Sequence, residues 1–231
     1  MTQPVDAITL DVGGPLYTDE NFVVAMLGAL DELRSEHGLS TVDRVSFRSV
    51  YDDLRQRQAG GLRRAMAAEF LGDAALAGLL HERLGPRWVH PEGSLYADVL
   101  PALRQLHGRV RIAILANQEA AVVDALRRDG VADFVDVWGV SAVVGFEKPD
   151  PRLFEWVLAE LGASADRTVH IGNRLDTDVR PARSMGMRAV WVLRGEAPDD
   201  PTAEQRAEAD GVVRSLAELP AVLTGLAEGV R

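Results

Sequence analysis

Cysteine is absent from the 231 residues, which excludes a disulfide framework, a thiolate nucleophile and a zinc–thiolate site. Long apolar runs are absent as well, and nothing in the chain approaches the length needed to cross a bilayer. Residues 1–7 contain no basic segment of the kind that begins a secretory signal. We therefore expect a cytoplasmic protein.

Positive charge is scarce, because 25 Lys and Arg residues face 35 Asp and Glu residues and give a net charge of -10. Binding to nucleic acid depends on neutralising phosphates, and binding to anionic lipid depends on basic clusters. The charge balance therefore predicts neither a nucleic-acid partner nor a membrane partner. The five histidines are scattered and show no metal-ligand spacing.

Lysine is almost missing. Lys148 is the only one, so 24 of the 25 Lys and Arg residues are arginine. A compact ammonium on a flexible stem has properties that a planar guanidinium cannot reproduce. The single lysine therefore marks position 148 for attention.

The hydrophobic pattern divides the chain into a helical insert within an alternating α/β sequence. A short β-branched run at residues 7–12 ends at Gly13-Gly14-Pro15 and predicts a buried strand. Apolar spacing of three and four then predicts helices at residues 22–34, 45–57, 62–71 and 74–84. Beyond residue 92, strands are predicted at 111–115, 168–171 and 188–193, an apolar segment at 134–140, helices at 97–106, 119–129, 151–161 and 177–185, and a final strand and helix within 211–226. The acidic stretch 196–204 is expected to be a solvated loop.

Alternation of strands and helices predicts a doubly wound parallel sheet covered on both faces. We expect an α/β core formed by residues 1–14 and 92–231, with an all-helical cap at residues 15–91. Ligands of such sheets bind at the carboxyl ends of the strands. The residues at these ends are Asp11, Ala116-Asn117, Lys148 and Gly172-Asn173.

Each of these residues has an ordinary structural explanation when taken alone, as a turn, a helix cap or a solvated loop residue. Together they resemble the four ordered motifs of the haloacid dehalogenase superfamily. These motifs are a hydrophobic strand followed by Asp, a second strand followed by a hydroxyl residue and often Asn, a Lys-Pro pair, and a Gly-Asp…Asp loop. The corresponding stretches are Asp11-Val12-Gly13, Leu115-Ala116-Asn117, Lys148-Pro149 and Gly172-Asn173 to Asp178.

The resemblance implies a covalent mechanism in which Asp11 attacks the substrate and water hydrolyses the resulting ester or acyl-phosphate. It implies that Lys148 anchors the nucleophile and that Asn117 orients the substrate. The glycine turn at Gly13 and Gly14, together with Ala116, would lie against the bound anion. In family phosphatases a Mg²⁺ is held by positions that correspond to Asp11, the carbonyl of Gly13, and Asn173 or Asp178.

Three positions depart from the usual motifs. Gly13 replaces the acid that protonates the leaving oxygen, a contribution typically worth ~10²–10⁴-fold in rate. Ala116 replaces a hydroxyl residue, and Asn173 replaces an acid at the metal position.

These departures leave several functions open. Phosphate monoester hydrolysis of a small anionic metabolite is favoured. Metal-free cleavage of a carbon–halogen bond is an alternative, because a halide leaves without a proton, and Arg55 in the cap would then hold the substrate carboxylate. Carbon–phosphorus cleavage needs a cap lysine, which residues 15–91 lack. A catalytically impaired metabolite binder is the non-enzymatic alternative, and the protein is expected to be a monomer or a homodimer.

Overall fold

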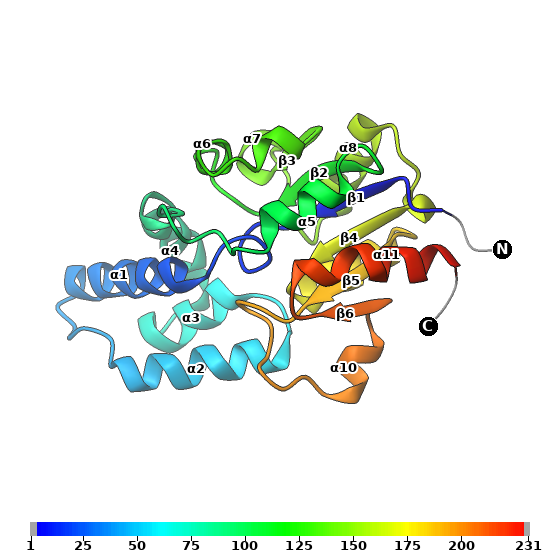
Figure 1. The fold of residues 1–231 in the computed structure, drawn as a ribbon. Helices are drawn as coiled ribbons and strands as arrows, with labels where there is room; N and C mark the ends of the chain where they lie inside the picture. Colours follow the sequence, from blue (N-terminus) through cyan, green and yellow to red (C-terminus); the bar gives the residue numbers. More distant parts are fainter. Residues whose placement is uncertain (1–3, 229–231) are drawn as a thin grey trace.

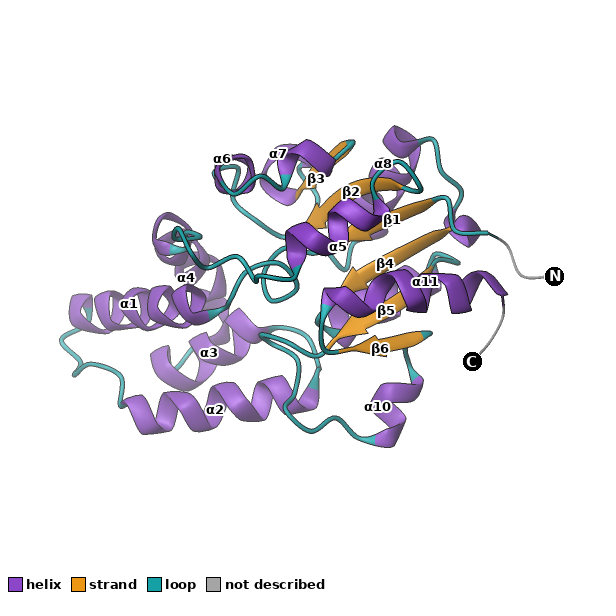
Figure 2. Cartoon of the chain, in the orientation of Figure 1, coloured by secondary structure: helices purple, strands orange, loops and turns teal. Residues whose placement is uncertain are grey.

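The computed structural model describes residues 4–228. Its centre is a parallel six-stranded sheet with the order β3-β2-β1-β4-β5-β6 (Figures 1 and 2). The strands are β1 (Ala7–Leu10), β2 (Arg111–Ala116), β3 (Val137–Val140), β4 (Thr168–Gly172), β5 (Arg188–Val192) and β6 (Gly211–Val213). The doubly wound α/β core expected from the alternating pattern is confirmed.

Helices cover both faces of the sheet. One apolar layer joins the sheet to α5 (Val99–Leu106), α6 (Val122–Arg128) and α11 (Leu219–Glu228). The opposite layer joins it to α8 (Pro151–Leu161) and α9 (Arg180–Ser184). β2 and β5 are almost wholly buried. Because helices cover both faces of these strands, their sequences are nearly continuous apolar runs.

The helices after β1 form a separate cluster (Figure 1). They are α1 (Glu20–Glu36), α2 (Arg44–Arg57), α3 (Leu62–Leu71) and α4 (Ala77–Leu84). Their apolar stripes meet in a core of their own, which includes Met26, Leu30, Phe47, Met66 and Leu80. We call residues 20–84 the cap.

The segment between β1 and the cap packs against the core. Leu16 and Tyr17 are fully buried in the core's apolar cluster, and Tyr17 forms a β-bridge with Leu95. The hydroxyl of Tyr17 also donates to Asp129 at 2.8 Å. The boundaries predicted at residues 14 and 92 stay a prediction, but Leu16 and Tyr17 pack on the core side.

The expectation that residues 196–204 form a solvated loop is met only in part: residues 196–202 form no helix or strand and the side chain of Asp199 is 90% exposed, but other groups of the segment are covered. Ala197 is buried, and Glu196 pairs with Arg174 at 3.0 Å. The segment leads into α10 (Ala203–Ala207), which begins at a capping box formed by Thr202 and Gln205 and was not predicted. Its acidic composition suggested solvent exposure, but several of its groups have partners in the cap and core.

The remaining elements are short. They are α7 (Ser141–Val144), the 3₁₀ turns η1 (Ala74–Leu76), η2 (Gly85–Arg87), η3 (Ala132–Phe134), η4 (Ala165–Arg167) and η6 (Leu216–Glu218), and the π-helical turn η5 (Leu175–Val179). Within residues 4–228, no helix combines the length and hydropathy required of a membrane span.

Candidate active site

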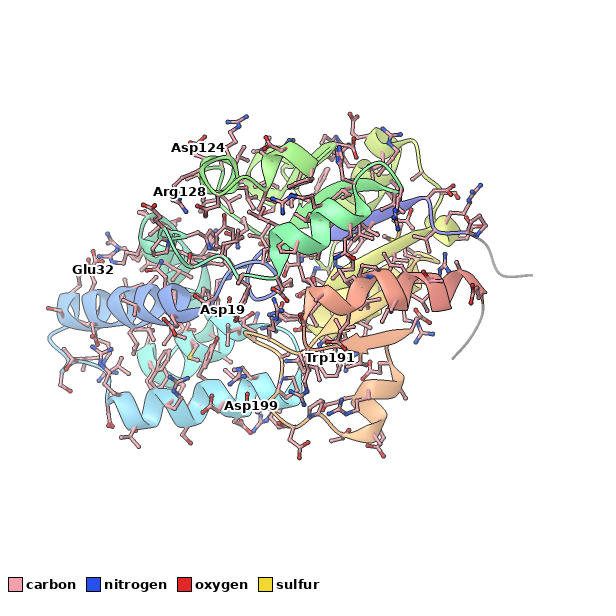
Figure 3. All side chains as sticks on the ribbon, viewed as in Figure 1. Asp19, Glu32, Asp124, Arg128, Trp191 and Asp199 are labelled. Carbon is pink, nitrogen blue, oxygen red and sulfur yellow. The ribbon has the colours of Figure 1, made fainter. Side chains whose placement is uncertain are left out.

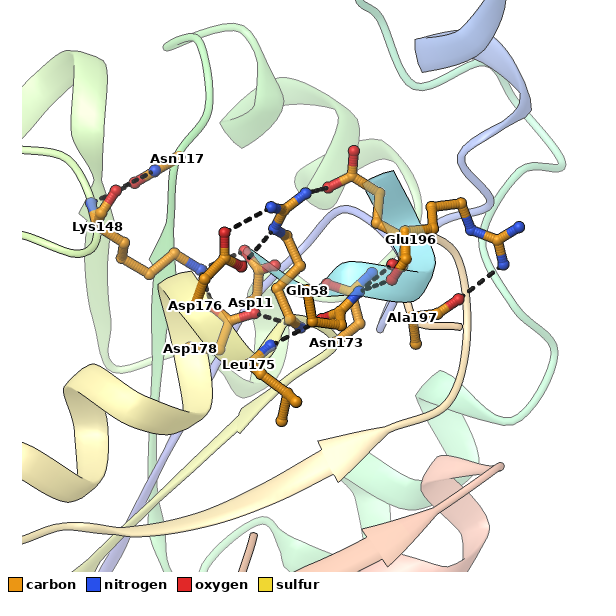
Figure 4. Close-up of polar contacts among 12 residues, drawn as sticks. Asp11, Gln58, Asn117, Lys148, Asn173, Leu175, Asp176, Asp178, Glu196 and Ala197 are labelled. Carbon is orange, nitrogen blue, oxygen red and sulfur yellow. Dashed lines mark hydrogen bonds and ion pairs between the residues drawn. The ribbon is translucent and has the colours of Figure 1, made fainter. Parts of the chain in front are cut away.

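Loops at the carboxyl edge of the sheet bring the chemically important side chains together (Figure 4). Asp11 follows β1, Asn117 follows β2 and Asn173 follows β4. Because β1 lies between β2 and β4, these three loops are neighbours. Lys148 reaches the same place from the segment between α7 and α8.

Lys148 joins two carboxylates. Its Nζ lies 2.8 Å from Asp11 Oδ1 and 2.5 Å from Asp178 Oδ1, and the side chain is 2% exposed. Burial disfavours the ammonium, but Asp11 and Asp178 outweigh this effect and raise the pKa of Lys148. The only lysine of the chain is therefore a buried, charged group between two acids.

The two acids differ in their affinity for a proton. Burial raises the pKa of Asp11 to about 6 despite the opposing effect of Lys148. Burial acts in the same direction on Asp178, yet Lys148 and His170 hold the pKa of Asp178 well below its ordinary value. Asp178 is therefore the permanent counter-ion of Lys148, and Asp11 is the acid whose charge is less fully compensated.

His170 supports Asp178 from within the sheet. Its Nε2 lies 3.3 Å from Asp178 Oδ1, and its Nδ1 lies 2.8 Å from the hydroxyl of Thr9 on the adjacent strand. Burial lowers the pKa of His170, so the ring is neutral. An ionised carboxylate only accepts hydrogen bonds, so we assign the ring proton to Nε2, and Nδ1 accepts from Thr9.

Asn117 holds the backbone of Lys148. The Lys148 amide donates to Asn117 Oδ1 at 2.6 Å, and Asn117 Nδ2 donates to the Lys148 carbonyl at 2.8 Å. We expected Asn117 to orient the substrate, but both of its polar groups are used to position the lysine. Ala116 ends β2 and is fully buried.

Two glycines allow the fourth-motif side chains to approach closely. Gly14 has φ +89°, and a Cβ there would lie 2.0 Å from Asn173 Nδ2. A Cβ at Gly172 would lie 2.3 Å from Asp178 Cγ. Any larger residue at either position would displace Asn173 or Asp178.

A cavity of about 410 Å³ opens above Asp11, between the core and the cap. The core contributes Asp11, Asn117 and Lys148, the cap contributes Phe22 and Arg63, and Trp88 lines the cavity from the segment that follows the cap. Arg63 also forms an ion pair with Glu147 of the core at 3.1 Å. The cavity therefore lies between Asp11 and Lys148 of the core and side chains of the cap.

A sequence model of the haloacid dehalogenase-like hydrolases matches residues 5–186, which is most of the chain. The chain belongs to the haloacid dehalogenase-like hydrolase family. The resemblance drawn from the four motifs is thereby confirmed, and the order of the motifs agrees with the convergence of Asp11, Lys148 and Asp178.

Several relatives of this chain are named phosphatases. A phosphoserine phosphatase of Thermus thermophilus is 43% identical over 115 residues, which are 47% of this chain and 45% of that protein. A ribulose-1,5-bisphosphate 5-phosphatase of Halopiger xanaduensis is 32% identical over 155 residues, which are 64% of this chain and 61% of that protein. The matches to the curated relatives that rank first span about half of their length.

A solved structure extends the likeness to nearly the whole chain. The crystal structure of CbbY from Rhodobacter sphaeroides in complex with phosphate has a TM-score of 0.67 and 25% identity. The match covers 95% of this chain and 99% of that chain. This likeness includes the cap as well as the core.

The oxygen donors at the family's metal position are Asp11, the Gly13 carbonyl and Asn173. Asn173 Nδ2 donates to the Arg194 carbonyl at 3.1 Å, which leaves its Oδ1 as the atom for a cation. Within residues 4–228, no group of three or more His, Cys, Asp or Glu side chains forms a metal cluster. The set fits Mg²⁺ because all its donors are hard oxygens, but it offers one carboxylate rather than two.

Asp178 was predicted as a possible metal ligand, and its surroundings suit a different role. Its Oδ1 accepts from Lys148 at 2.5 Å, and its Oδ2 accepts from the Arg174 amide at 2.9 Å. The side chain has no exposed surface. Asp178 therefore lies behind Lys148 as its counter-ion.

Arg55 lies outside the residues that line the cavity. Its Nη2 donates to the Ala197 carbonyl at 2.7 Å and to Asp199 at 2.9 Å. The side chain is only 14% exposed, so it is neither a solvated surface residue nor a group facing the substrate. Arg55 therefore links α2 to the segment after β5 through these hydrogen bonds.

Three residues of the site were not singled out from the sequence. His170 lies within a strand, where burial hides its role. Arg174 pairs with Asp176 at 2.7 Å and with Glu196 at 3.0 Å at the rim of the cavity. Asp19 also lines the cavity. The position of Asp19 before a predicted helix suggests only a cap residue, and no spacing rule connects it to Asp11.

Proposed function

We propose that this protein hydrolyses phosphate monoesters of small organic molecules through a covalent intermediate on Asp11. The observation that carries the proposal is the contact of Asp11 with Lys148 at 2.8 Å, at the base of a cavity between the core and the cap. The matched relatives named above are phosphatases, which favours phosphate over other leaving groups.

Asp11 attacks the phosphorus atom, and the bond from phosphorus to the ester oxygen breaks. Lys148 stabilises the charge that develops on the phosphoryl oxygens, because it is a fixed cation in a buried site. Asn117 keeps Lys148 in place through its backbone. Water then cleaves the aspartyl-phosphate and releases inorganic phosphate.

Mg²⁺ is the proposed cofactor, with Asp11, the Gly13 carbonyl and Asn173 as its protein ligands. When bound, the ion would neutralise the phosphoryl oxygens and the carboxylate of the nucleophile. A single carboxylate at this position predicts weaker binding than a two-acid site would give. The substrate is proposed to be a small anionic metabolite, and the cytoplasmic location and the monomeric or homodimeric state stay predictions.

The test is an assay of phosphate release from a panel of phosphate monoesters, with added Mg²⁺ and with EDTA. Short 2-halo acids are assayed in parallel for halide release. Metal-dependent phosphate release supports the proposal. Metal-independent halide release would replace it with dehalogenation, and tight binding of anions without turnover would replace it with a binding role.

Asp11→Asn is expected to lower phosphate release by at least about 10³-fold, because the amide is a poor nucleophile and removes one of the two carboxylates that contact Lys148. Asp124→Asn is the matched control, since the side chain of Asp124 is 82% exposed on α6. Full activity in the Asp11→Asn protein would contradict every covalent version of the function.

A further inference from the structure

The space beside Gly13 is occupied by side chains from three other parts of the chain. A Cβ at Gly13 would lie 3.3 Å from Gln118 Nε2, 3.5 Å from Trp88 Cζ2 and 3.7 Å from Asp19 Oδ1. An amide and an indole do not exchange protons at neutral pH, whereas a carboxyl group does. A titratable acid is therefore present where the acid missing from position 13 would project.

Asp19 sits at the start of α1 but does not serve the helix as a cap. It occupies the N-cap position without a side-chain capping hydrogen bond. Its Oδ2 is buried and has no hydrogen-bond partner within residues 4–228. A buried carboxylate oxygen without a partner is costly, so the group requires a proton or a ligand.

A glycine in the neighbouring loop leaves room for the carboxyl group of Asp19. A Cβ at Gly195 would lie 2.1 Å from Asp19 Oδ2, and Gly195 has φ +56°. The carboxyl therefore fits against a residue that must be glycine, at the wall of the cavity that also contains Asp11. Figure 3 places Asp19 between the cap and the core.

Asp19 is also distinguished by its lack of a cation. The other acids that line the cavity form ion pairs, which are Asp11–Lys148, Glu147–Arg63, Asp176–Arg174 and Glu196–Arg174. In the part of the chain that the structure describes, Asp19 has no such pair. Burial, followed by the charges of Glu196 and Asp11, raises the pKa of Asp19 well above its ordinary value and outweighs the opposing effects of Arg55 and the Glu196 amide.

We propose that Asp19 is the general acid and base of the reaction, in place of the carboxyl group that Gly13 lacks. This assignment rests on the proposed phosphatase function. As Asp11 bonds to phosphorus, the electron pair of the breaking P–O bond goes to the ester oxygen, and the Asp19 carboxyl gives that oxygen its proton. The alcohol leaves, and the Asp19 carboxylate then takes one proton from the water that cleaves the aspartyl-phosphate, which restores both acids.

The experiment compares leaving groups in the unmodified protein and in Asp19→Asn. An aliphatic phosphate ester must have its leaving oxygen protonated, whereas 4-nitrophenyl phosphate releases an anion that is stable without a proton. Asp19→Asn is expected to lower kcat for the aliphatic ester by ~10²–10⁴-fold and to change kcat for the nitrophenyl ester by less than about tenfold. A series of substituted phenyl phosphates should show a steeper dependence on leaving-group pKa in the variant.

Two further variants separate a chemical role from a structural one. Gly13→Asp in the Asp19→Asn background restores an acid at the usual place, and it should recover hydrolysis of the aliphatic ester. Glu20→Gln changes the neighbouring exposed acid of the same helix and should leave both esters unaffected. Thermal unfolding of each variant is measured, and Asp19→Ser, which can cap a helix, replaces Asp19→Asn if that protein does not fold.

The outcomes distinguish this assignment from the function on which it rests. An equal loss on both esters, or no loss on either, overturns the role of Asp19 and leaves the phosphatase intact. A loss that added Mg²⁺ reverses on both esters assigns Asp19 to cation binding instead. Absence of phosphate release by the unmodified protein overturns the phosphatase and the assignment together.

Discussion

The ammonium of Lys148 faces two carboxylates, so one positive charge is shared between two negative charges. This imbalance governs the chemistry of the site. The negative charge of Asp178 is well compensated, because His170 and the Arg174 amide donate hydrogen bonds to it in addition to Lys148. Asp11 is held at 2.8 Å with fewer fixed partners, so a substrate can compete for it. Arginine supplies positive charge nearly everywhere else in this chain, but a guanidinium is planar and cannot converge on two carboxylates from one atom.

Lys148→Arg tests whether charge alone is sufficient. The longer, planar group cannot occupy the buried position between Asp11 and Asp178 without displacing one of them, and a misplacement of about 1 Å in an active site can cost ~10²-fold in rate. We expect kcat to fall by at least about that factor. Steady-state kinetics on the best phosphate ester measure it, with Arg48→Lys on the exposed face of α2 as the control; an active Lys148→Arg protein would show that only charge matters.

At the scale of elements, one partly buried ion pair and the hydrogen bonds beside it hold the ends of β5 and β6 against α5. Asp98, just before α5, accepts hydrogen bonds from Arg194 after β5 and from the Leu216 amide after β6, the latter at 2.9 Å. Burial opposes the charge of Asp98, but Arg194 and Ser215 outweigh it and lower its pKa. These contacts position the loop that carries Gly195, which lies against Asp19, and Glu196, which lines the cavity.

Asp98→Asn should lower the free energy of unfolding by about 1–2 kcal/mol at pH 7, after allowance for solvent screening. Because the pKa of Asp98 is lowered in the folded protein, its contribution is present above the unfolded value of about 4 and is lost as the pH falls through the folded value. Urea unfolding of both proteins from neutral pH to about pH 3 measures the difference. The difference in free energy of unfolding between the two proteins should be constant at higher pH and should disappear in acid. A difference that grows in acid would contradict a lowered pKa for Asp98.

For the whole molecule, Gln58 is a buried residue that joins the cap to the core. This residue ends α2 with φ 48° and has no exposed surface. Its Nε2 donates to the Glu196 carbonyl at 2.7 Å, and its Oε1 accepts from the Leu175 amide at 2.9 Å. Arg180 donates to its carbonyl at 2.8 Å. One side chain therefore connects the cap with both loops that flank the cavity.

Gln58→Ala and Gln58→Gly both remove the side-chain bonds, and each should destabilise the protein by about 1–3 kcal/mol. Glycine accepts the left-handed backbone without cost, so Gln58→Gly should be the more stable of the two by about 1 kcal/mol. Both should raise KM, because the cap is held less closely over the cavity. Hydrogen exchange of the Leu175 amide reports the docking directly, and unchanged protection in both variants would contradict this role.

Local sequence determined most strands and helices and the positions of Asp11, Lys148 and Asp178, because apolar periodicity and turn residues act within a few positions of one another; β3 was expected only as an apolar segment. It could not identify the partners of Asn117 or Arg55, the burial of Ala197, or the acid beside Gly13. Those contacts join residues that are distant along the chain. They depend on how far the cap rotates toward the core and on which side-chain rotamers that packing permits. Asp19 is an ordinary helix-start residue in the sequence, and only the tertiary structure brings its carboxyl group beside the glycine where the usual acid is missing.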